Sequence, residues 1–300
     1  MLGLVVDSRE CTWVRVHKKR ERRRVESYGS CPTPAGAVQN GIVRDPADLG
    51  AALKAALRPA RFYREEVAVC LSGLQFFVRS FSLPGLKPRD LARAVSYKVA
   101  AEVPIPLEDL AVDYRLPPGA GGEIVAVVTR RTNLQQLVLA LKLAGLTPRV
   151  IDIEPYCLLR AATGRQDDGR GATAILSLNR ESPQFSFFLD GILRFHRFLP
   201  ANHAVTGQEA GFWPGVAPEL GRSLAFCRQE FYRTGAIRVL VTGIPLPPEI
   251  SATLENQAAA PPAYLTMVEG VELSPSLPAG AAAELAAGWA AALGLALRRG

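Results

Sequence analysis

The sequence predicts an α/β protein of two lobes, with a small α+β domain inserted in the first lobe. Each half of the chain opens with an apolar strand, a short polar turn and a further hairpin, and then adds helices. A polar, glycine-rich segment at 164–171 separates the halves and is typical of a hinge. Because 300 residues suffice for two packed lobes, we expect a duplicated architecture with a cleft between the lobes.

The first lobe is expected to begin with strands at Leu2–Val6, Thr12–Val16 and Arg24–Tyr28. A helix should follow from Asp45, because an aspartate suits the N-cap and Pro46 suits the first helical position.

An inserted domain is predicted at 65–148, where the pattern strand, strand, helix occurs twice. Its expected strands are Glu66–Cys70, Gln75–Phe81, Val112–Leu116 and Glu123–Thr129, and its helices lie at 88–101 and from Thr132. The remaining chain then divides into the first lobe at 1–64 and 149–165, the second lobe at 166–285, and a C-terminal helix at 286–300 that returns to the first lobe.

The second lobe carries the clearest local signal in the chain. Asp190-Gly191 stands between two apolar runs, Phe185–Leu189 and Ile192–Phe198. Asp-Gly between such runs favours a tight β-hairpin, because both turn residues must adopt positive φ. A strand at Thr173–Leu178 is expected to precede this hairpin.

The composition fits a folded protein, with 48% hydrophobic and 21% charged residues. The apolar run Met1–Val6 is too short for a signal sequence. The alanine-rich run Ala281–Leu297 is too weakly apolar for a membrane span. We therefore expect a cytoplasmic chain.

The five cysteines and three histidines show no metal-binding spacing, and no Cys-x-x-Cys motif occurs. We expect reduced, buried thiols and no zinc site. No Gly-x-Ser-x-Gly motif marks a nucleophile, and Asp113-Tyr114 is isolated, so no catalytic residue is assigned.

Several short segments, taken together in their order and spacing, resemble the PilM family of type IV pilus assembly proteins. They are Gly3–Ser8, Gly36–Ile42, Phe81–Pro84, Ala101–Pro106, Asp113-Tyr114, Ala144–Pro148, Asp152–Glu154 and Leu293–Arg298. The resemblance implies an actin-like (ribonuclease H-like) fold. It also implies a cytoplasmic scaffold of a type IV pilus or a related secretion or competence machine, peripheral at the inner membrane. Its partners would be the N-terminal tail of a PilN-like inner-membrane protein and other pilus assembly proteins.

The resemblance also allows the nucleotide site of actin-like ATPases to be compared. There the first phosphate hairpin typically reads Asp-x-Gly-Ser followed shortly by Lys. The matching positions here hold Val5, Asp7, Ser8 and Thr12, so only the serine is kept. A valine cannot order the water shell of Mg²⁺, and an aspartate in place of glycine directs negative charge toward phosphate.

The second hairpin and the adenosine loop depart in the same way. Ser177-Leu178-Asn179 replaces Asp-x-Gly, and Gly243 is followed by Ile244 where adjacent glycines are usual. We therefore expect a pseudo-ATPase that needs no cofactor. The alternative is a functional actin-like ATPase, in which ATP and Mg²⁺ would be held by Asp7, Ser8, Asn179 and Gly243.

The resemblance places the partner tail where the inserted domain meets the first lobe. The candidate segments are Phe81–Leu86 and Val103–Leu107, which could equally be ordered connecting loops. The candidate contact residues are Leu83, Pro84, Leu86, Val103 and Ile105.

A basic run at His17–Arg24 is either a solvated hairpin tip or a contact for anionic lipid headgroups. Each basic residue near such a surface contributes ~1 kcal/mol. The residues proposed for this patch are Lys18, Lys19, Arg22 and Arg23. No aromatic residue interleaves the run, so no specific nucleic acid is expected as a partner.

Overall fold

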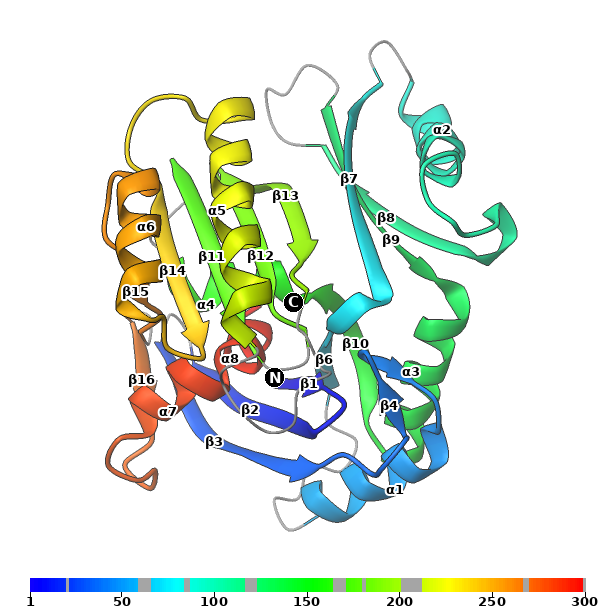
Figure 1. Ribbon diagram of the computed structural model, residues 1–300. Helices are drawn as coiled ribbons and strands as arrows, with labels where there is room; N and C mark the ends of the chain where they lie inside the picture. Colours follow the sequence, from blue (N-terminus) through cyan, green and yellow to red (C-terminus); the bar gives the residue numbers. More distant parts are fainter. Residues whose placement is uncertain are drawn as a thin grey trace.

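The computed structural model describes residues 1–19, 22–58, 66–83, 87–116, 123–163, 171–179, 182–200, 212–266 and 270–298. These residues form two sheet-based lobes and a smaller three-stranded unit (Figure 1). Within this part of the chain, no helix combines the length and apolar character needed to cross a bilayer.

The first lobe is built on a six-stranded sheet in the order β10-β6-β1-β2-β3-β16. Its central strand β1 pairs antiparallel with β2 and parallel with β6. The strands are β1 (Leu2–Val6), β2 (Glu10–Lys19), β3 (Arg22–Pro32), β6 (Glu66–Leu71), β10 (Thr147–Ile153) and β16 (Val271–Leu273).

The second lobe repeats this pattern in a five-stranded sheet in the order β13-β12-β11-β14-β15. Its central strand β11 pairs antiparallel with β12 and parallel with β14, as β1 pairs with β2 and β6. The strands are β11 (Ala172–Leu178), β12 (Gln184–Leu189), β13 (Ile192–Phe198), β14 (Arg238–Gly243) and β15 (Ala263–Tyr264). The predicted two-lobed α/β class is therefore confirmed.

The predicted Asp-Gly hairpin joins β12 to β13. Asp190 and Gly191 have φ angles of 52° and 73°, so both turn residues adopt the left-handed region that a two-residue hairpin requires. The Asp190 carboxylate accepts the backbone N–H of Gly171 at 2.9 Å, which ties the turn to the start of β11.

Helix α1 (Pro46–Leu57) begins as predicted. The Asp45 carboxylate caps it by accepting the backbone N–H groups of Ala47 and Asp48 at 2.9 and 3.0 Å. Helix α3 (Arg131–Leu143) packs on α1, and its N-cap is Arg130, two residues before the predicted Thr132 cap. Two short elements connect the strands along the chain. The two-stranded ribbon of β4 (Val38–Gln39) and β5 (Ile42–Val43) follows β3, and a 3₁₀ turn η1 (Gly73–Gln75) follows β6.

The inserted unit is a three-stranded antiparallel sheet in the order β7-β9-β8, covered by one helix (Figure 1). Its apolar residues, among them Val95, Val99, Ile124 and Val128, form a core of their own. Its elements are β7 (Phe76–Ser82), α2 (Pro88–Ala100), η2 (Leu107–Asp109), β8 (Leu110–Arg115) and β9 (Glu123–Arg130).

This unit is smaller than the predicted domain at 65–148. The first predicted strand of that block, β6, pairs with β1 and β10 in the sheet of the first lobe, and α3 packs on α1. The difference arises because periodicity identifies a strand but not its partner, which is a long-range choice.

Helices pack on both sheets. Helix α8 lies on β1 and β2 and against α4, whereas α5 and α6 cover the second sheet (Figure 1). The bounds are α4 (Glu154–Thr163), α5 (Phe212–Glu230), α6 (Pro248–Ala258), α7 (Ala281–Gly288) and α8 (Ala290–Ala296).

Helices α4 and α8 approach each other closely at Gly294. A Cβ atom added there would lie 1.8 Å from the carbonyl oxygen of Cys157, which is backbone and cannot rotate away. The glycine is therefore required by the closeness of the two helices and not by its own φ angle.

We predict that Gly294→Ala destabilises the protein by about 1–3 kcal/mol, because α8 must move off α4 to make room for the methyl group. Gly288→Ala is the matched control, since an added Cβ meets no atom within 4 Å. Urea denaturation of both variants measures the difference. Equal midpoints for the two variants would contradict the assigned close contact.

Candidate functional site

A cavity of about 290 Å³ lies in the crevice between the two lobes. It is lined by the β1–β2 turn, the start of α4, the end of β11, the end of β14 and the α7–α8 junction. Three residues that the sequence predicts for a nucleotide site, Asp7, Asn179 and Gly243, line this cavity together. The fourth, Ser8, follows Asp7 in the turn.

Hydroxyl groups hold the end of β1 at the crevice. Ser72 donates its hydroxyl to the carbonyl of Val6 at 2.8 Å, and Thr33 donates to the carbonyl of Asp7 at 2.7 Å. The Asp7 carboxylate accepts the backbone N–H of Ser8 at 2.5 Å. The carboxylate is therefore engaged within its own turn.

Gly243 is explained by backbone packing alone. Its φ angle is 90°, and an added Cβ would lie 2.3 Å from the carbonyl oxygen of Leu178. The same carbonyl accepts the N–H of Ile244 at 2.8 Å. A glycine is thus needed here to join β14 to β11, whether or not a ligand binds.

Glu154 is a buried carboxyl group in the crevice that sequence reasoning missed. It begins α4, is 7% exposed, and accepts the hydroxyl of Ser177 at 3.0 Å. Burial raises the pKa of the Glu154 carboxyl to about 7, and the negative charge of Asp7 adds to the shift. Its only sequence signal is its position in Asp152-Ile-Glu154, at the junction of a strand and a helix.

The charged groups that line the crevice are mostly acidic. Its charged residues are three acids, Asp7, Glu10 and Glu154, and one base, Arg9. The acids would repel phosphate. Among the residues that the structure describes, no group of three or more His, Cys, Asp or Glu could hold a metal ion. The crevice does continue toward a cavity of about 430 Å³ lined mainly by apolar atoms, which shares Thr242 and Gly243 with it.

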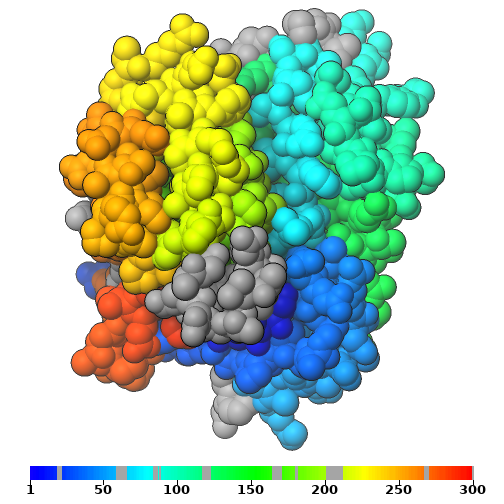
Figure 2. Space-filling model, viewed as in Figure 1, coloured from blue at the N-terminus to red at the C-terminus, as the bar shows by residue number. Residues whose placement is uncertain are grey.

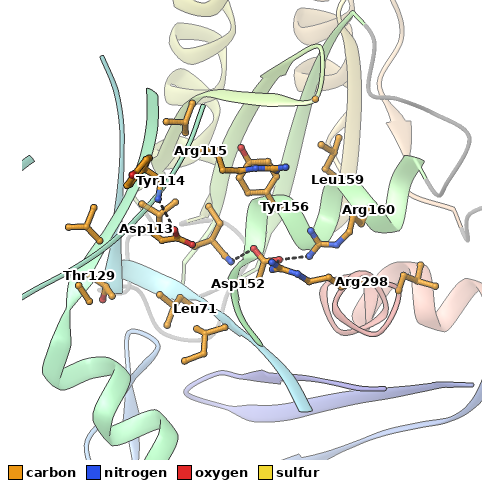
Figure 3. A pocket seen from close by; sticks show the side chains of 18 of the residues that line it. Leu71, Asp113, Tyr114, Arg115, Thr129, Asp152, Tyr156, Leu159, Arg160 and Arg298 are labelled. Atoms are coloured by element: carbon orange, nitrogen blue, oxygen red, sulfur yellow. Dashed lines mark hydrogen bonds and ion pairs between the residues drawn. The ribbon is translucent and has the colours of Figure 1, made fainter. Parts of the chain in front are cut away.

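A larger cavity, of about 760 Å³, lies between the inserted unit and the first lobe (Figure 3). Its walls are β8 and β9 on one side, and β10, α4 and the residues after α8 on the other. We call it the groove. It is within the size range of ligand-binding pockets, roughly 300–1,000 Å³.

The groove runs along the free edge of β8. This strand is at the edge of the β7-β9-β8 sheet, and its five consecutive residues 111–115 all line the groove. Successive side chains of a strand point to opposite faces of a sheet. A cavity that touches all five therefore follows the edge of the strand, where backbone N–H and C=O groups are not paired within the sheet.

The floor of the groove is apolar and half-buried. It includes Val127 on β9, Leu134 on α3, Ile151 on β10 and Tyr156 on α4. The guanidinium group of Arg115 lies 5.8 Å from the centre of the Tyr156 ring (Figure 3). The floor thus offers contacts for apolar side chains, bordered by a cation.

One end of the groove is an ion-pair cluster. The Asp152 carboxylate accepts hydrogen bonds from Arg160, at 2.7 Å, and from Arg298 (Figure 3). Arg160 also donates to the carbonyl of Gly294 at 3.0 Å. The charged residues lining the groove are four arginines, Arg23, Arg115, Arg160 and Arg298, and two aspartates, Asp113 and Asp152, an excess of two positive charges.

The second lobe contacts the inserted unit beside the groove. Arg194 of β13 pairs with Glu123 of β9, and the ring of His196 stacks on Phe76 of β7 at 5.1 Å. Burial lowers the pKa of His196 to about 3, so the ring is neutral in this contact. In Figure 2 the yellow-green second lobe and the cyan inserted unit meet along one seam of the surface.

The predicted partner-binding residues do not line the groove. Val103 and Ile105 are 7% and 6% exposed and belong to the core of the inserted unit, and Leu83 packs against the same core. These apolar side chains are unavailable to a partner because they pack against α2. Pro84 and Leu86 lie outside the described residues.

The basic run is divided between two environments. Arg23 is only 7% exposed and lines the groove, so it is not part of an exposed patch as predicted. Lys18 and Arg22 are exposed, and Arg22 lies 3.9 Å from Glu272 of β16. The backbone of Lys19 belongs to β2. Contact of this run with anionic lipid stays a prediction.

We predict that replacing Glu154 with glutamine changes how stability depends on pH. The native state keeps the carboxyl protonated up to about pH 7, whereas the unfolded chain releases this proton near 4.5. The proton therefore stabilises the native state at low pH, and this contribution is lost as pH rises from 4.5 to 7.

Glu154→Gln keeps a neutral group at all pH values. Its stability relative to the original protein should rise between pH 5 and pH 8, by up to about 3 kcal/mol. Urea denaturation at both pH values measures the change. Glu10→Gln is the control, since Glu10 is exposed in the same crevice. A difference that does not vary with pH would show that Glu154 is not buried in this way.

Comparison with known proteins agrees with this geometry. The family model of the type IV pilus assembly protein PilM matches residues 3–175, more than half of the chain. A solved structure of a PilM–PilN type IV pilus biogenesis complex superposes with a TM-score of 0.82, at 22% identity, covering 99% of this chain and 97% of that one.

The cytoplasmic domain of EpsL, an inner-membrane component of the type II secretion system of Vibrio cholerae, is also similar. Its TM-score is 0.53 at 15% identity, with 92% of this chain and 90% of that chain covered. At these identities the superpositions establish the fold, and the family model establishes the membership. The chain belongs to the PilM family of type IV pilus assembly proteins and has its actin-like fold.

Proposed function

We propose that this protein is a docking scaffold of a type IV pilus machine, and that its groove receives the N-terminal tail of a PilN-like inner-membrane protein. The observation that carries the proposal is the free edge of β8, whose residues 111–115 all line the groove. The similar PilM–PilN complex supports the identity of the partner.

The groove suits an extended peptide better than a compact ligand. A peptide laid along β8 would pair its backbone with the free edge of the strand, and this pairing supplies affinity without regard to sequence. Alternate side chains of such a peptide would point to the apolar floor formed by Val127, Leu134 and Ile151. The floor would therefore set the sequence preference.

The charges of the groove add a second criterion for the sequence of the bound peptide. Asp152 accepts from both Arg160 and Arg298, so the ion-pair cluster at this end keeps one net positive charge that can face a ligand. We expect a peptide whose carbonyl or acidic groups face this end.

The protein would act on the cytoplasmic side of the inner membrane, held there peripherally through its partner. The likeness to a type II secretion component extends only to the fold. Other assembly factors would bind the remaining surface.

We also infer that the crevice does not hydrolyse ATP. The support is chemical: Asp7 is engaged within its own turn, acids outnumber bases, and Gly243 is explained by packing against Leu178. One observation favours an actin-like ATPase as the second candidate, namely the buried carboxyl of Glu154 facing the crevice. Such a group could accept a proton from water, since its pKa is near neutral.

The groove is tested by Val127→Arg. The side chain faces the groove from β9, and arginine would fill the apolar floor and repel the positive end. Titration calorimetry with a synthetic peptide of the partner's cytoplasmic N-terminal residues should show at least about a tenfold weaker Kd.

The matched control is Leu139→Arg. Leu139 is 44% exposed on α3 and is not among the residues that line the groove. It should bind the peptide like the original protein. Circular dichroism and melting curves identify any loss of folding. Equal affinity of a folded Val127→Arg variant would remove the groove from the proposal.

The crevice is tested by titration with Mg-ATP and by phosphate release. We expect no binding up to about 1 mM and no hydrolysis above background. Micromolar binding that is lost in Asp7→Ala, together with hydrolysis lost in Glu154→Gln, would establish the ATPase instead.

A further inference from the structure

Two cysteines lie directly opposite each other on neighbouring strands of the first sheet. Cys11 of β2 and Cys31 of β3 are register partners in the antiparallel pair. The two thiols are near enough to each other to shift each other's pKa. Neither is part of the crevice lining or the groove lining. The proposed docking function therefore makes no use of them.

The spacing of the two backbones suits a disulfide. Two residues away in the ladder, the N–H of Thr33 donates to the carbonyl of Arg9 at 2.9 Å, which marks a hydrogen-bonded pair. Because such pairs alternate, Cys11 and Cys31 also occupy a hydrogen-bonded position, where opposite Cα atoms lie about 5.5 Å apart. This value is within the range of roughly 4.4–6.8 Å found in disulfides.

The two thiols differ in accessibility and in acidity. Cys31 is half-buried at the edge of the core, whereas Cys11 is buried. The neighbouring Cys11 thiol holds the pKa of the Cys31 thiol below its usual value. The Cys31 thiol, together with burial, raises the pKa of Cys11. Cys31 is thus the thiol with greater thiolate character and easier access for a reagent.

We propose that Cys11 and Cys31 form an oxidant-sensitive dithiol, which a hydroperoxide converts to a disulfide across β2 and β3. The Cys31 thiolate attacks one peroxide oxygen, the O–O bond breaks, and Cys31 becomes a sulfenic acid while hydroxide leaves and takes up a proton. The sulfur of Cys11 then attacks the sulfur of Cys31, its proton and the sulfenic hydroxyl leave as water, and the S–S bond forms. Two electrons pass from the two thiols to the peroxide.

A second thiol pair in the same lobe provides an internal comparison. Cys70 of β6 and Cys157 of α4 belong to one small core cluster, and both are buried. The neighbouring Cys157 thiol and burial raise the pKa of Cys70. The two thiols of this pair are close to each other but are not accessible to solvent. An oxidant dissolved in water should therefore leave them reduced.

The disulfide would form next to the crevice. The Cys11 sulfur lies 3.5 Å from the Thr33 hydroxyl, which in turn donates to the carbonyl of Asp7. Drawing that sulfur toward Cys31 removes a neighbour of the group that holds the Asp7 turn. Oxidation is therefore expected to act on the turn between β1 and β2 as well as to cross-link β2 and β3.

The experiment is peroxide treatment of the purified full chain, followed by blocking of free thiols, trypsin digestion without reductant and mass spectrometry. Trypsin releases Cys11 in residues 10–15 and Cys31 in residues 25–44, so the linked pair is distinct from every other cysteine peptide. We expect this linked species to be the main oxidation product and to disappear on treatment with dithiothreitol.

Two variants complete the test. Cys31→Ser should abolish the linked species and leave Cys11 reduced, and this half-buried site tolerates serine better than the buried Cys11. Cys70→Ser should give the same linked yield as the original protein. Overoxidation of Cys31 without a link, or a Cys70–Cys157 link in equal yield, would overturn the proposal.

Discussion

The close contact between α4 and α8 is the constraint on which both candidate sites depend. Gly294 allows the backbone of α8 to touch that of α4 at Cys157, and Arg160 bonds across the contact to the carbonyl of Gly294. This contact fixes α4 against the first sheet. Helix α4 then directs Glu154 into the crevice at its start and Arg160 into the groove along its length. A single packed helix pair therefore positions the residues of two cavities.

The groove also depends on the edge strand β8. An unpaired edge attracts other strands, and proteins normally shorten, charge or cover it. In this protein the edge of β8 faces the first lobe across the groove, and the exposed Asp113 and Arg115 place charges along it. In the proposed function, this edge receives a narrow extended peptide.

Local signals in the sequence predicted the local structure well. Asp190-Gly191 and the Asp45 cap each act within a few residues, so their outcome needed no knowledge of the rest of the fold. The two-lobed class followed from the repeated order of elements. Choices that depend on long-range contacts did not follow. The partner of β6 and the burial of Val103 and Ile105 are set by segments distant in sequence.

The site was predicted only in part for the same reason. Asp7, Asn179 and Gly243 do meet in one crevice, because the two lobes repeat the same turn. Glu154 was missed since its burial requires Ser177 from the other lobe. The resemblance indicated the region between the inserted unit and the first lobe, but the residues of the groove were not predicted, because its floor combines side chains from β9, α3, β10 and α4. No window of sequence contains that surface.

A glycine at a candidate ligand site is weak evidence for the ligand. Gly243 would be needed even in an empty crevice, because the carbonyl of Leu178 occupies the space of a side chain. A buried acidic group is stronger evidence for a role at the crevice, because a buried carboxyl such as Glu154 costs stability when it ionises. Its presence has two physical explanations, a remaining role in proton transfer or a structural hydrogen bond to Ser177. The structural bond alone accounts for the described geometry of Glu154. We therefore place the proposed docking site in the groove and not in the crevice.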